Sequence, residues 1–270
     1  MEKITEANSL YNNLENMTTT ELLYNINTED QKVSDVIKGE IPNISKLSDV
    51  IFQRITNNGR LFYIGSGTSG RLGILDASEC PPTFGVSKNI IMGIIAGGDK
   101  AIREAIESAE DNNEQAWEDL KQYNITEKDI VIGISASGTT PYVVGGLKKC
   151  QENNIYTGSI TCNQSTIIDN YSNVAIKLLV GPEFITGSTR MKAGSAQKMT
   201  LNMLSTSVMI KLGHVVGNKM IDMKISNSKL KNRGIEMIIN QCKVSKEKAI
   251  SLLESNGNVR KSIKKFNETK

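Results

Sequence analysis

The chain of 270 residues is poor in the residues that build metal centres and disulfide frameworks. Its four cysteines are widely scattered and form no CxxC pair, which argues against a disulfide framework and against a zinc site. It has one histidine, His214, so a histidine-based metal site and a histidine-rich active site are excluded. We therefore expect no metal in this protein.

Long apolar runs and a strong net charge are absent as well. No run approaches the ~20 apolar residues that cross a bilayer, and the N-terminus lacks the basic and apolar regions of a secretory signal. The net charge of +3 is too small to indicate nucleic acid, and the basic stretch at 261–266 is typical of a solvated helix face. We expect a cytoplasmic protein with neither a membrane nor a nucleic-acid partner.

Short apolar runs, in contrast, recur along the chain. Most are β-branched and fully apolar, as strands buried on both faces should be. Segments with helical spacing lie between the first four, and this alternation predicts an α/β fold with a parallel five-stranded sheet between helices. The expected strands are "LFYI" (61–64), "IIMGII" (90–95), "IVIGI" (130–134), "YTGSIT" (156–161) and "VAIKLLV" (174–180).

Helices are expected before, between and after these strands. Residues 18–57 have an apolar stripe, and Thr28 with Gln31 fits a capping box. The helix after the first strand should end at Pro81 and Pro82. A further helix should begin at Pro141, where a missing N–H costs nothing. Residues 195–213 predict a long buried helix, and 226–266 predict two or three short helices interrupted at 256–258.

Glycines and small hydroxyl residues follow the carboxyl ends of the strands, the edge where parallel sheets bind ligands. The first loop, "GSGTSG", matches the GxGxxG pattern of dinucleotide-binding proteins, which is a weak signal by itself. That pattern also needs an acidic residue ~20 positions on to hold a ribose. Asp99 lies 34 residues after Gly65 and beyond two glycines, which is the wrong position. A phosphorylated small molecule is therefore favoured over a nicotinamide cofactor.

A second loop, "SASGTT", strengthens this interpretation. Its hydroxyls precede Pro141 and a helix N-terminus, where free N–H groups and the positive helix end attract a phosphate. The alternative is that these hydroxyls only cap helices. The candidate phosphate-binding residues of the two loops are Ser66, Thr68, Ser69, Ser135, Ser137, Thr139 and Thr140.

Four longer motifs resemble one known family. They are "GSGTSGRLGILDASECPPTFG", "GIIAGGDKAIREAIESAEDN", "IGISASGTTPYVVGGL" and "VGPEFITGSTRMKAGSAQKMTLNM". They are similar to the N-acetylmuramic acid 6-phosphate etherases, which contain a SIS (sugar isomerase) domain. The resemblance implies a flavodoxin-like SIS domain at 59–215, a helical N-terminal extension at 1–58 packed on it and a helical region at 216–270. Many family members have a longer helical tail than this chain.

The resemblance also implies an activity and its catalytic residues. Family members cleave the D-lactyl ether of N-acetylmuramic acid 6-phosphate, giving N-acetylglucosamine 6-phosphate and D-lactate. Glu79 and Glu110 match the family's catalytic positions. One carboxylate would remove the hydrogen at carbon 2, and the other would protonate the departing lactate and then activate water. This chemistry needs no metal and no cofactor, and belongs to amino-sugar catabolism and cell-wall recycling.

Read without the resemblance, both glutamates have simpler explanations. Glu79 would end a helix, where the dipole favours its protonated form, or it is a surface residue before a turn. Glu110 lies in an acidic cluster that is typical of a solvated helix face. The loop before residue 195 is unusually polar, and Arg190 or Lys192 would suit the lactyl carboxylate. The alternative is a surface loop whose charged residues have no contact with substrate. The candidate substrate contacts in this loop are Glu183, Ser188, Arg190 and Lys192.

Two other functions stay open on the sequence alone. A sugar-phosphate isomerase would use the same fold and the same acidic carbon 2 hydrogen, but would need no acid at carbon 3. A non-catalytic sugar-phosphate sensor would need neither glutamate and usually carries a partner-binding or DNA-binding module, of which residues 1–60 give no sign. Because SIS proteins commonly dimerise, the resemblance implies a homodimer.

Overall fold

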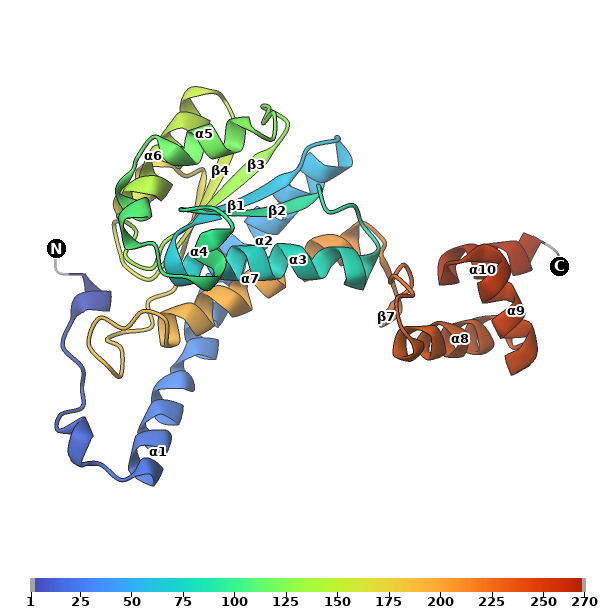
Figure 1. Cartoon of the computed structure of the whole chain (residues 1–270), viewed down its shortest axis with the longest axis horizontal. Coiled ribbons are helices and arrows are strands. Elements are labelled where there is room, and N and C mark those ends of the chain that lie inside the picture. The colour runs from blue at the N-terminus through green and yellow to red at the C-terminus, as the bar shows by residue number, and fades with distance from the viewer. Residues whose placement is uncertain (1–2, 269–270) are drawn as a thin grey trace. The chain divides into compact units, whose positions relative to one another are not determined.

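The computed structural model describes residues 3–268, which pack into two compact units. The first unit comprises the chain up to Ala77 and Asn89–Ser205. The second comprises Ser78–Lys88 and the chain from Thr206 onward. Both boundaries fall within helices, since α3 (Gly67–Phe84) contains the one after Ala77 and α7 (Lys192–Lys211) contains the one after Ser205. The ribbon is shown in Figure 1.

The first unit is built on a five-stranded sheet in the order β2-β1-β3-β4-β5, with every neighbouring pair parallel. This is the doubly wound order of flavodoxin-like folds. All five predicted strands are confirmed, with ends that differ by a few residues. The strands are β1 (Leu61–Gly65), β2 (Ile91–Ile95), β3 (Ile130–Ile134), β4 (Tyr156–Thr161) and β5 (Val174–Lys177).

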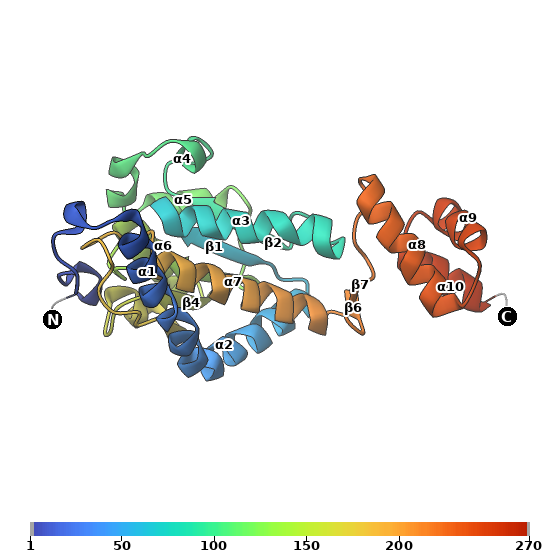
Figure 2. The same ribbon diagram turned by 90° about the horizontal axis from the view of Figure 1, so that it is seen from below.

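Helices cover both faces of this sheet (Figures 1 and 2). Phe62 and Ile64 face α5 and α6 and share a buried core with Leu120 and Leu147. Tyr63 faces the other side, where α3 passes so close that a Cβ on Gly73 would lie 2.9 Å from the Tyr63 Cβ. The helices of this unit are α1 (Thr19–Asp30), α2 (Lys32–Thr56), α4 (Lys100–Arg103), α5 (Gln115–Lys121), α6 (Pro141–Glu152) and the parts of α3 (Gly67–Phe84) and α7 (Lys192–Lys211) that precede Ser78 and Thr206, with short 3-10 turns at Ile4–Glu6, Leu14–Asn16, Glu107–Asp111 and Ile167–Tyr171.

Two predicted helix ends were wrong. Helix α3 does not stop at Pro81 and Pro82 but continues to Phe84. Proline keeps a helical φ and removes only its own N–H, so the helix ends where Gly85 adopts a left-handed φ of 70° and donates its N–H to the Pro81 carbonyl.

The predicted capping box was also wrong. The box forms at Thr18 and Glu21, ahead of α1, because that pair stands directly before the first apolar helical positions. Thr28 lies inside α1, and its hydroxyl donates to the Tyr24 carbonyl at 2.9 Å. Helix α6 begins at Pro141 as predicted.

The second unit contains a small helical bundle with its own apolar core, which includes Ile235, Ile238 and Leu253. The predicted interruption at 256–258 is confirmed, because Gly257 ends one helix in the left-handed region with φ 67°. The bundle consists of α8 (Ser228–Cys242), α9 (Lys246–Asn256) and α10 (Val259–Glu268), after a two-stranded hairpin of β6 (Val215–Val216) and β7 (Lys219–Met220).

Within this unit the only histidine of the chain is held by a carboxylate. His214 Nδ1 lies 3.0 Å from Asp222 Oδ2, and Arg260 donates to both oxygens of the same carboxylate at 2.7 Å. Burial raises the pKa of Asp222, but hydrogen bonds from Arg260 and His214 more than offset this and hold it below its usual value. The ion pair of Arg260 with Asp222, joined by His214 through a hydrogen bond, ties α10 to the segment before α8.

Candidate active site

The two hydroxyl-rich loops predicted to bind phosphate meet at one edge of the sheet. They follow β1 and β3, which are neighbours with Gly65 paired to Ile134. Between them lies a cavity of about 400 Å³. All seven predicted phosphate-binding residues line it: Ser66, Thr68, Ser69, Ser135, Ser137, Thr139 and Thr140.

Two helix N-termini also border this cavity. Helix α3 starts at Gly67 and α6 starts at Pro141, and both residues are in the lining. The turn into α3 is very tight, since a Cβ on Gly65 would lie 2.8 Å from the Gly70 nitrogen. The free N–H groups and the positive ends of two helices favour a negatively charged group, which agrees with the expected phosphate.

The hydroxyls of the second loop form a connected network. The buried Ser135 hydroxyl lies 2.8 Å from Thr140 Oγ1 and 3.3 Å from Ser137 Oγ, and accepts the Gly138 N–H at 3.0 Å. Thr139 donates its hydroxyl to Ser137 at 3.2 Å. Ser135 therefore fixes the loop, while the other three residues are half-buried in the lining of the cavity.

In the first loop the side chains have different partners. The Ser66 hydroxyl donates to Glu110 Oε2. Ser69 is buried and donates to Gln197 Oε1 at 2.9 Å, so its hydroxyl is engaged by α7. Thr68 is half-buried in the cavity wall. Ser66 and Thr68 are thus better placed than Ser69 to give a hydroxyl to a ligand.

Sequence reasoning missed two cavity residues from the N-terminal segment. Lys3 and Glu6 line the cavity, and Lys3 Nζ donates to Thr139 Oγ1 at 2.9 Å. The segment is anchored by Thr5, whose N–H donates to Asn163 Oδ1 at 3.2 Å and whose hydroxyl accepts from Asn163 Nδ2 at 2.9 Å. Because these contacts join parts of the chain more than 130 residues apart, no local sequence pattern predicts them.

The polar loop after β5 contributes differently from what was expected. Thr189 lines the cavity, whereas none of the four predicted contact residues is in its lining. Ser188 is half-buried, and Arg190 is exposed. Glu183 is buried and accepts the N–H groups of Lys192 and Ala193 at 3.0 and 2.9 Å, so it caps α7.

Lys192 is engaged in a buried ion pair. Its Nζ lies 2.5 Å from Glu29 Oε2, and only 1% of Lys192 and 2% of Glu29 are exposed. Glu29 also accepts from Lys32 Nζ at 2.7 Å and Tyr11 Oη at 3.1 Å. Burial raises the pKa of Glu29, but the hydrogen bonds from Lys192 and Lys32 bring it below its usual value. Burial raises the pKa of Glu183 despite its two N–H donors.

The two predicted catalytic glutamates lie in different settings. Glu110, in the 3-10 turn Glu107–Asp111, is exposed and contributes to the cavity wall. Glu79 is exposed on α3, five residues before the end of that helix, so it is not at the helix terminus as expected. It follows Gly67 by twelve residues, which is about 18 Å along the helix axis.

Among the described side chains of residues 3–268, which leave out that of Glu107, there is no group of three or more histidines, cysteines, aspartates or glutamates that could hold a metal ion. The helices of the same range include none long and apolar enough to cross a membrane.

Comparison with family models and solved structures gives the class of this protein. Residues 43–151 match the glucokinase regulatory protein N-terminal SIS domain, and residues 101–207 match the SIS domain. A phosphoheptose isomerase from Francisella tularensis superposes with a TM-score of 0.58 at 14% identity, covering 72% of this chain and all of the other. The phosphoheptose isomerase of Neisseria gonorrhoeae gives 0.54 at 14%, covering 71% and 98%. The first unit is a SIS fold, as predicted.

Sequence relatives give the family within this class. An N-acetylmuramic acid 6-phosphate etherase of Christiangramia forsetii is 59% identical over 259 residues, covering 96% of this chain and 94% of the relative. One from Bacteroides thetaiotaomicron is 51% identical and covers 98% and 95%, and one from Clostridium acetobutylicum is 51% identical and covers 90% and 80%. The chain belongs to the N-acetylmuramic acid 6-phosphate etherase family.

Proposed function

We propose that this protein is a carbon–oxygen lyase that cleaves the D-lactyl ether of N-acetylmuramic acid 6-phosphate. The products are N-acetylglucosamine 6-phosphate and D-lactate. The observation that carries the proposal is the Glu110 carboxylate in the wall of a hydroxyl-lined anion cavity, in a chain 59% identical to a protein named for this activity. We place the work of the enzyme in the cytoplasmic recycling of cell-wall sugars.

In this proposal the hydroxyl loops and the two helix N-termini bind the 6-phosphate. The open-chain sugar has an aldehyde at carbon 1, which acidifies the hydrogen at carbon 2. Glu110 removes that proton, and lactate leaves carbon 3 with a proton from Glu79. Glu79 then takes a proton from water, whose oxygen bonds to carbon 3, and Glu110 returns its proton to carbon 2.

Two features support Glu110 as the base at carbon 2. Its carboxylate is at the cavity wall, and the Ser66 hydroxyl that donates to it fixes its direction. A general base has to lie within hydrogen-bond reach of the proton that it removes. The assignment of Glu79 as acid rests on its match to the family motif.

The first test is D-lactate release by the purified protein, with unphosphorylated N-acetylmuramic acid as the control substrate. Release from the phosphorylated sugar alone supports both the reaction and the phosphate cavity. A folded protein that binds sugar phosphates but releases no lactate would refute the lyase and leave the isomerase or the sensor.

The roles of the glutamates are tested by two variants and a matched control. Glu110→Gln should lower kcat by about 10²- to 10⁴-fold and stop exchange of the carbon 2 hydrogen with solvent. Glu79→Gln should stop lactate release but permit that exchange. Asp111→Asn, next to Glu110 but outside the cavity lining, should keep nearly full activity. Exchange lost in Glu79→Gln and kept in Glu110→Gln would reverse the assignment.

We also propose that the protein is a homodimer whose partner supplies Glu79. The distance of about 18 Å along α3 separates Glu79 from the phosphate end of its own helix. Exposed apolar side chains on α3 and α7, including Leu75 and Met199, are suited to a contact between subunits. Mixing inactive Glu79→Gln and Glu110→Gln proteins should restore about one quarter of wild-type activity if statistical heterodimers form with shared sites. A monomeric mass, or no recovery from exchanging dimers, would contradict this.

A further inference from the structure

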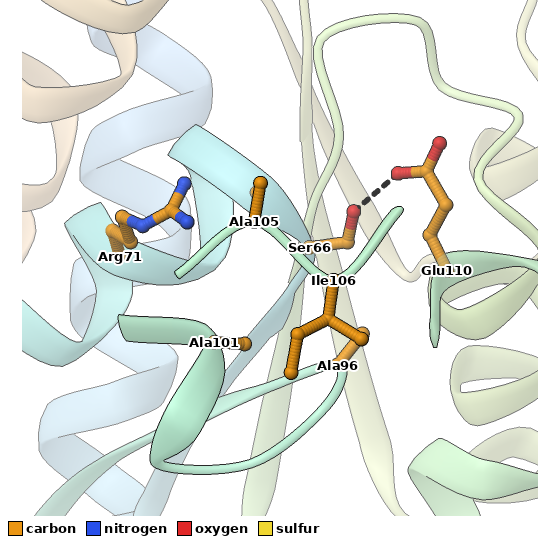
Figure 3. A pocket seen from close by; sticks show the side chains of 8 residues that line it. Ser66, Arg71, Ala96, Ala101, Ala105, Ile106 and Glu110 are labelled. Carbon is orange, nitrogen blue, oxygen red and sulfur yellow. Dashed lines mark hydrogen bonds between the residues drawn. The ribbon is translucent and has the colours of Figure 1, made fainter. Parts of the chain in front are cut away.

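A second, smaller cavity adjoins the phosphate cavity. Its volume is about 110 Å³, and it shares Ser66, Gly67 and Glu110 with the larger cavity. In Figure 3, Ser66 and Glu110 face each other on one side of it, joined by their hydrogen bond. A ligand that fills both cavities must therefore pass beside the Glu110 carboxylate.

One side of the small cavity is apolar. Ala101 belongs to α4, and Ala105 and Ile106 belong to the segment that leads to Glu110. These side chains have no polar atoms, so they offer only van der Waals contact. At about 30 Å³ per water molecule, the volume equals about four waters. The cavity suits a branch of about five non-hydrogen atoms and is too small for a hexose.

The lining includes one cation, Arg71 of α3, which lies across from Ser66 and Glu110 in Figure 3. Its Nε donates to the Ile102 carbonyl at 3.0 Å and its Nη2 to the Glu104 carbonyl at 3.3 Å. These bonds use two of the five N–H groups of a guanidinium. Among the described side chains of residues 3–268, a set without that of Glu107, no carboxylate forms an ion pair with Arg71. A ligand carboxylate would complete its hydrogen bonding.

We propose that this small cavity is the lactyl subsite, in which Arg71 binds the lactyl carboxylate and the apolar side contacts the methyl group. The inference rests on the proposed function. Beyond its ether oxygen, the lactyl group has five non-hydrogen atoms and ends in a planar carboxylate, which an arginine recognises with charge-assisted hydrogen bonds. With the phosphate in the larger cavity, the ether bond lies at the shared wall, beside Ser66 and Glu110.

This assignment replaces the sequence-based expectation that Arg190 or Lys192 holds the lactyl carboxylate. Lys192 is buried against Glu29, and neither residue is in the lining of either cavity. It also gives Arg71 a role in specificity, because an ether without a carboxylate would leave the guanidinium without its ligand partner.

The test compares two ethers of N-acetylglucosamine 6-phosphate. One is the natural 3-O-lactyl substrate, and the other is the 3-O-ethyl ether, in which hydrogen replaces the carboxylate. Formation of N-acetylglucosamine 6-phosphate measures both reactions. The wild-type protein should have a kcat/KM about 100-fold higher for the lactyl ether, the loss expected for a charge-assisted pair. Equal rates for the two ethers would refute the subsite without any variant.

Variants then assign the discrimination to Arg71. Arg71→Gln should lose about 100-fold in kcat/KM on the lactyl ether and less than about 3-fold on the ethyl ether. Arg71→Lys should recover part of the loss, because it keeps the charge but not the planar fork. Arg103→Gln, in nearby α4 but outside the lining, should behave as wild type.

Inhibition by the product separates binding at the two cavities. N-acetylglucosamine 6-phosphate has no lactyl group, so Arg71→Gln should leave its inhibition constant unchanged while weakening inhibition by D-lactate. Equal losses on both ethers, or weaker inhibition by the sugar phosphate, would show that Arg71 only holds the Ile102–Glu104 segment. If the wild-type protein forms no product from the lactyl substrate, the proposed function itself fails.

Discussion

The buried ion pair of Lys192 and Glu29 allows a direct test of whether Lys192 stabilises the fold or contacts the substrate. The sequence offered Arg190 or Lys192 as a partner of the lactyl carboxylate, whereas the structure buries the Lys192 ammonium 2.5 Å from Glu29 Oε2. Lys192→Met keeps the length of the side chain and removes its charge. It leaves Glu29, only 2% exposed, with Lys32 and Tyr11 as its partners.

The expected cost follows from this loss of one partner. Breaking a buried ion pair costs about 3–5 kcal/mol, because the remaining charge stays buried without compensation. The two donors that remain on Glu29 favour the lower end, about 3 kcal/mol. With a urea m-value of about 2 kcal/mol/M, the unfolding midpoint should fall by about 1.5 M.

The only tryptophan of the chain provides the assay. Trp117 packs against the core of the first unit, so its fluorescence follows unfolding of that unit. The double variant Lys192→Met with Glu29→Gln removes both charges and should be more stable than Lys192→Met alone. Where it is folded, Lys192→Met should keep the wild-type KM for the lactyl ether. A midpoint within about 0.3 M of wild type, or a KM raised 10-fold or more in folded protein, would refute this account.

Two further predictions concern packing and pH. Gly145→Ala in α6 should destabilise the protein by about 3 kcal/mol, because its Cβ would lie 1.6 Å from the Asn113 carbonyl oxygen. Gly39→Ala in α2, where a Cβ would meet open space, should stabilise the protein by about 1 kcal/mol. If the urea midpoints of the two variants shift in the same direction, the packing argument is wrong. The lowered pKa of Asp222 implies stabilisation that is present above the unfolded value of 3.8 and lost as pH falls through the folded value. Arg260→Gln should weaken this dependence of stability on pH, measured by the loss of helical circular dichroism on acidification. An unchanged pH dependence would contradict the role of the Arg260–Asp222 ion pair.

Much of this protein was determined locally by its sequence. Five apolar runs became five parallel strands because residues buried on both faces must be apolar along their whole length. The hydroxyl loops were placed together from chain order alone, since parallel strands present their carboxyl ends at one edge. Pro141 likewise marked the start of α6 through its fixed φ.

Tertiary structure decided which charges face the cavities. Lys192 and Arg71 are both basic residues near the start of a long helix, yet one is buried against Glu29 and the other lines the small cavity. Lys3 reaches Thr139 across 136 positions of sequence. Periodicity encodes which face of an element is apolar, but the partner of a charged side chain depends on how distant segments pack. The sequence alone therefore predicted the fold and the two neighbouring hydroxyl loops, and only the folded chain placed Arg71 at the small cavity where we propose that the lactyl group binds.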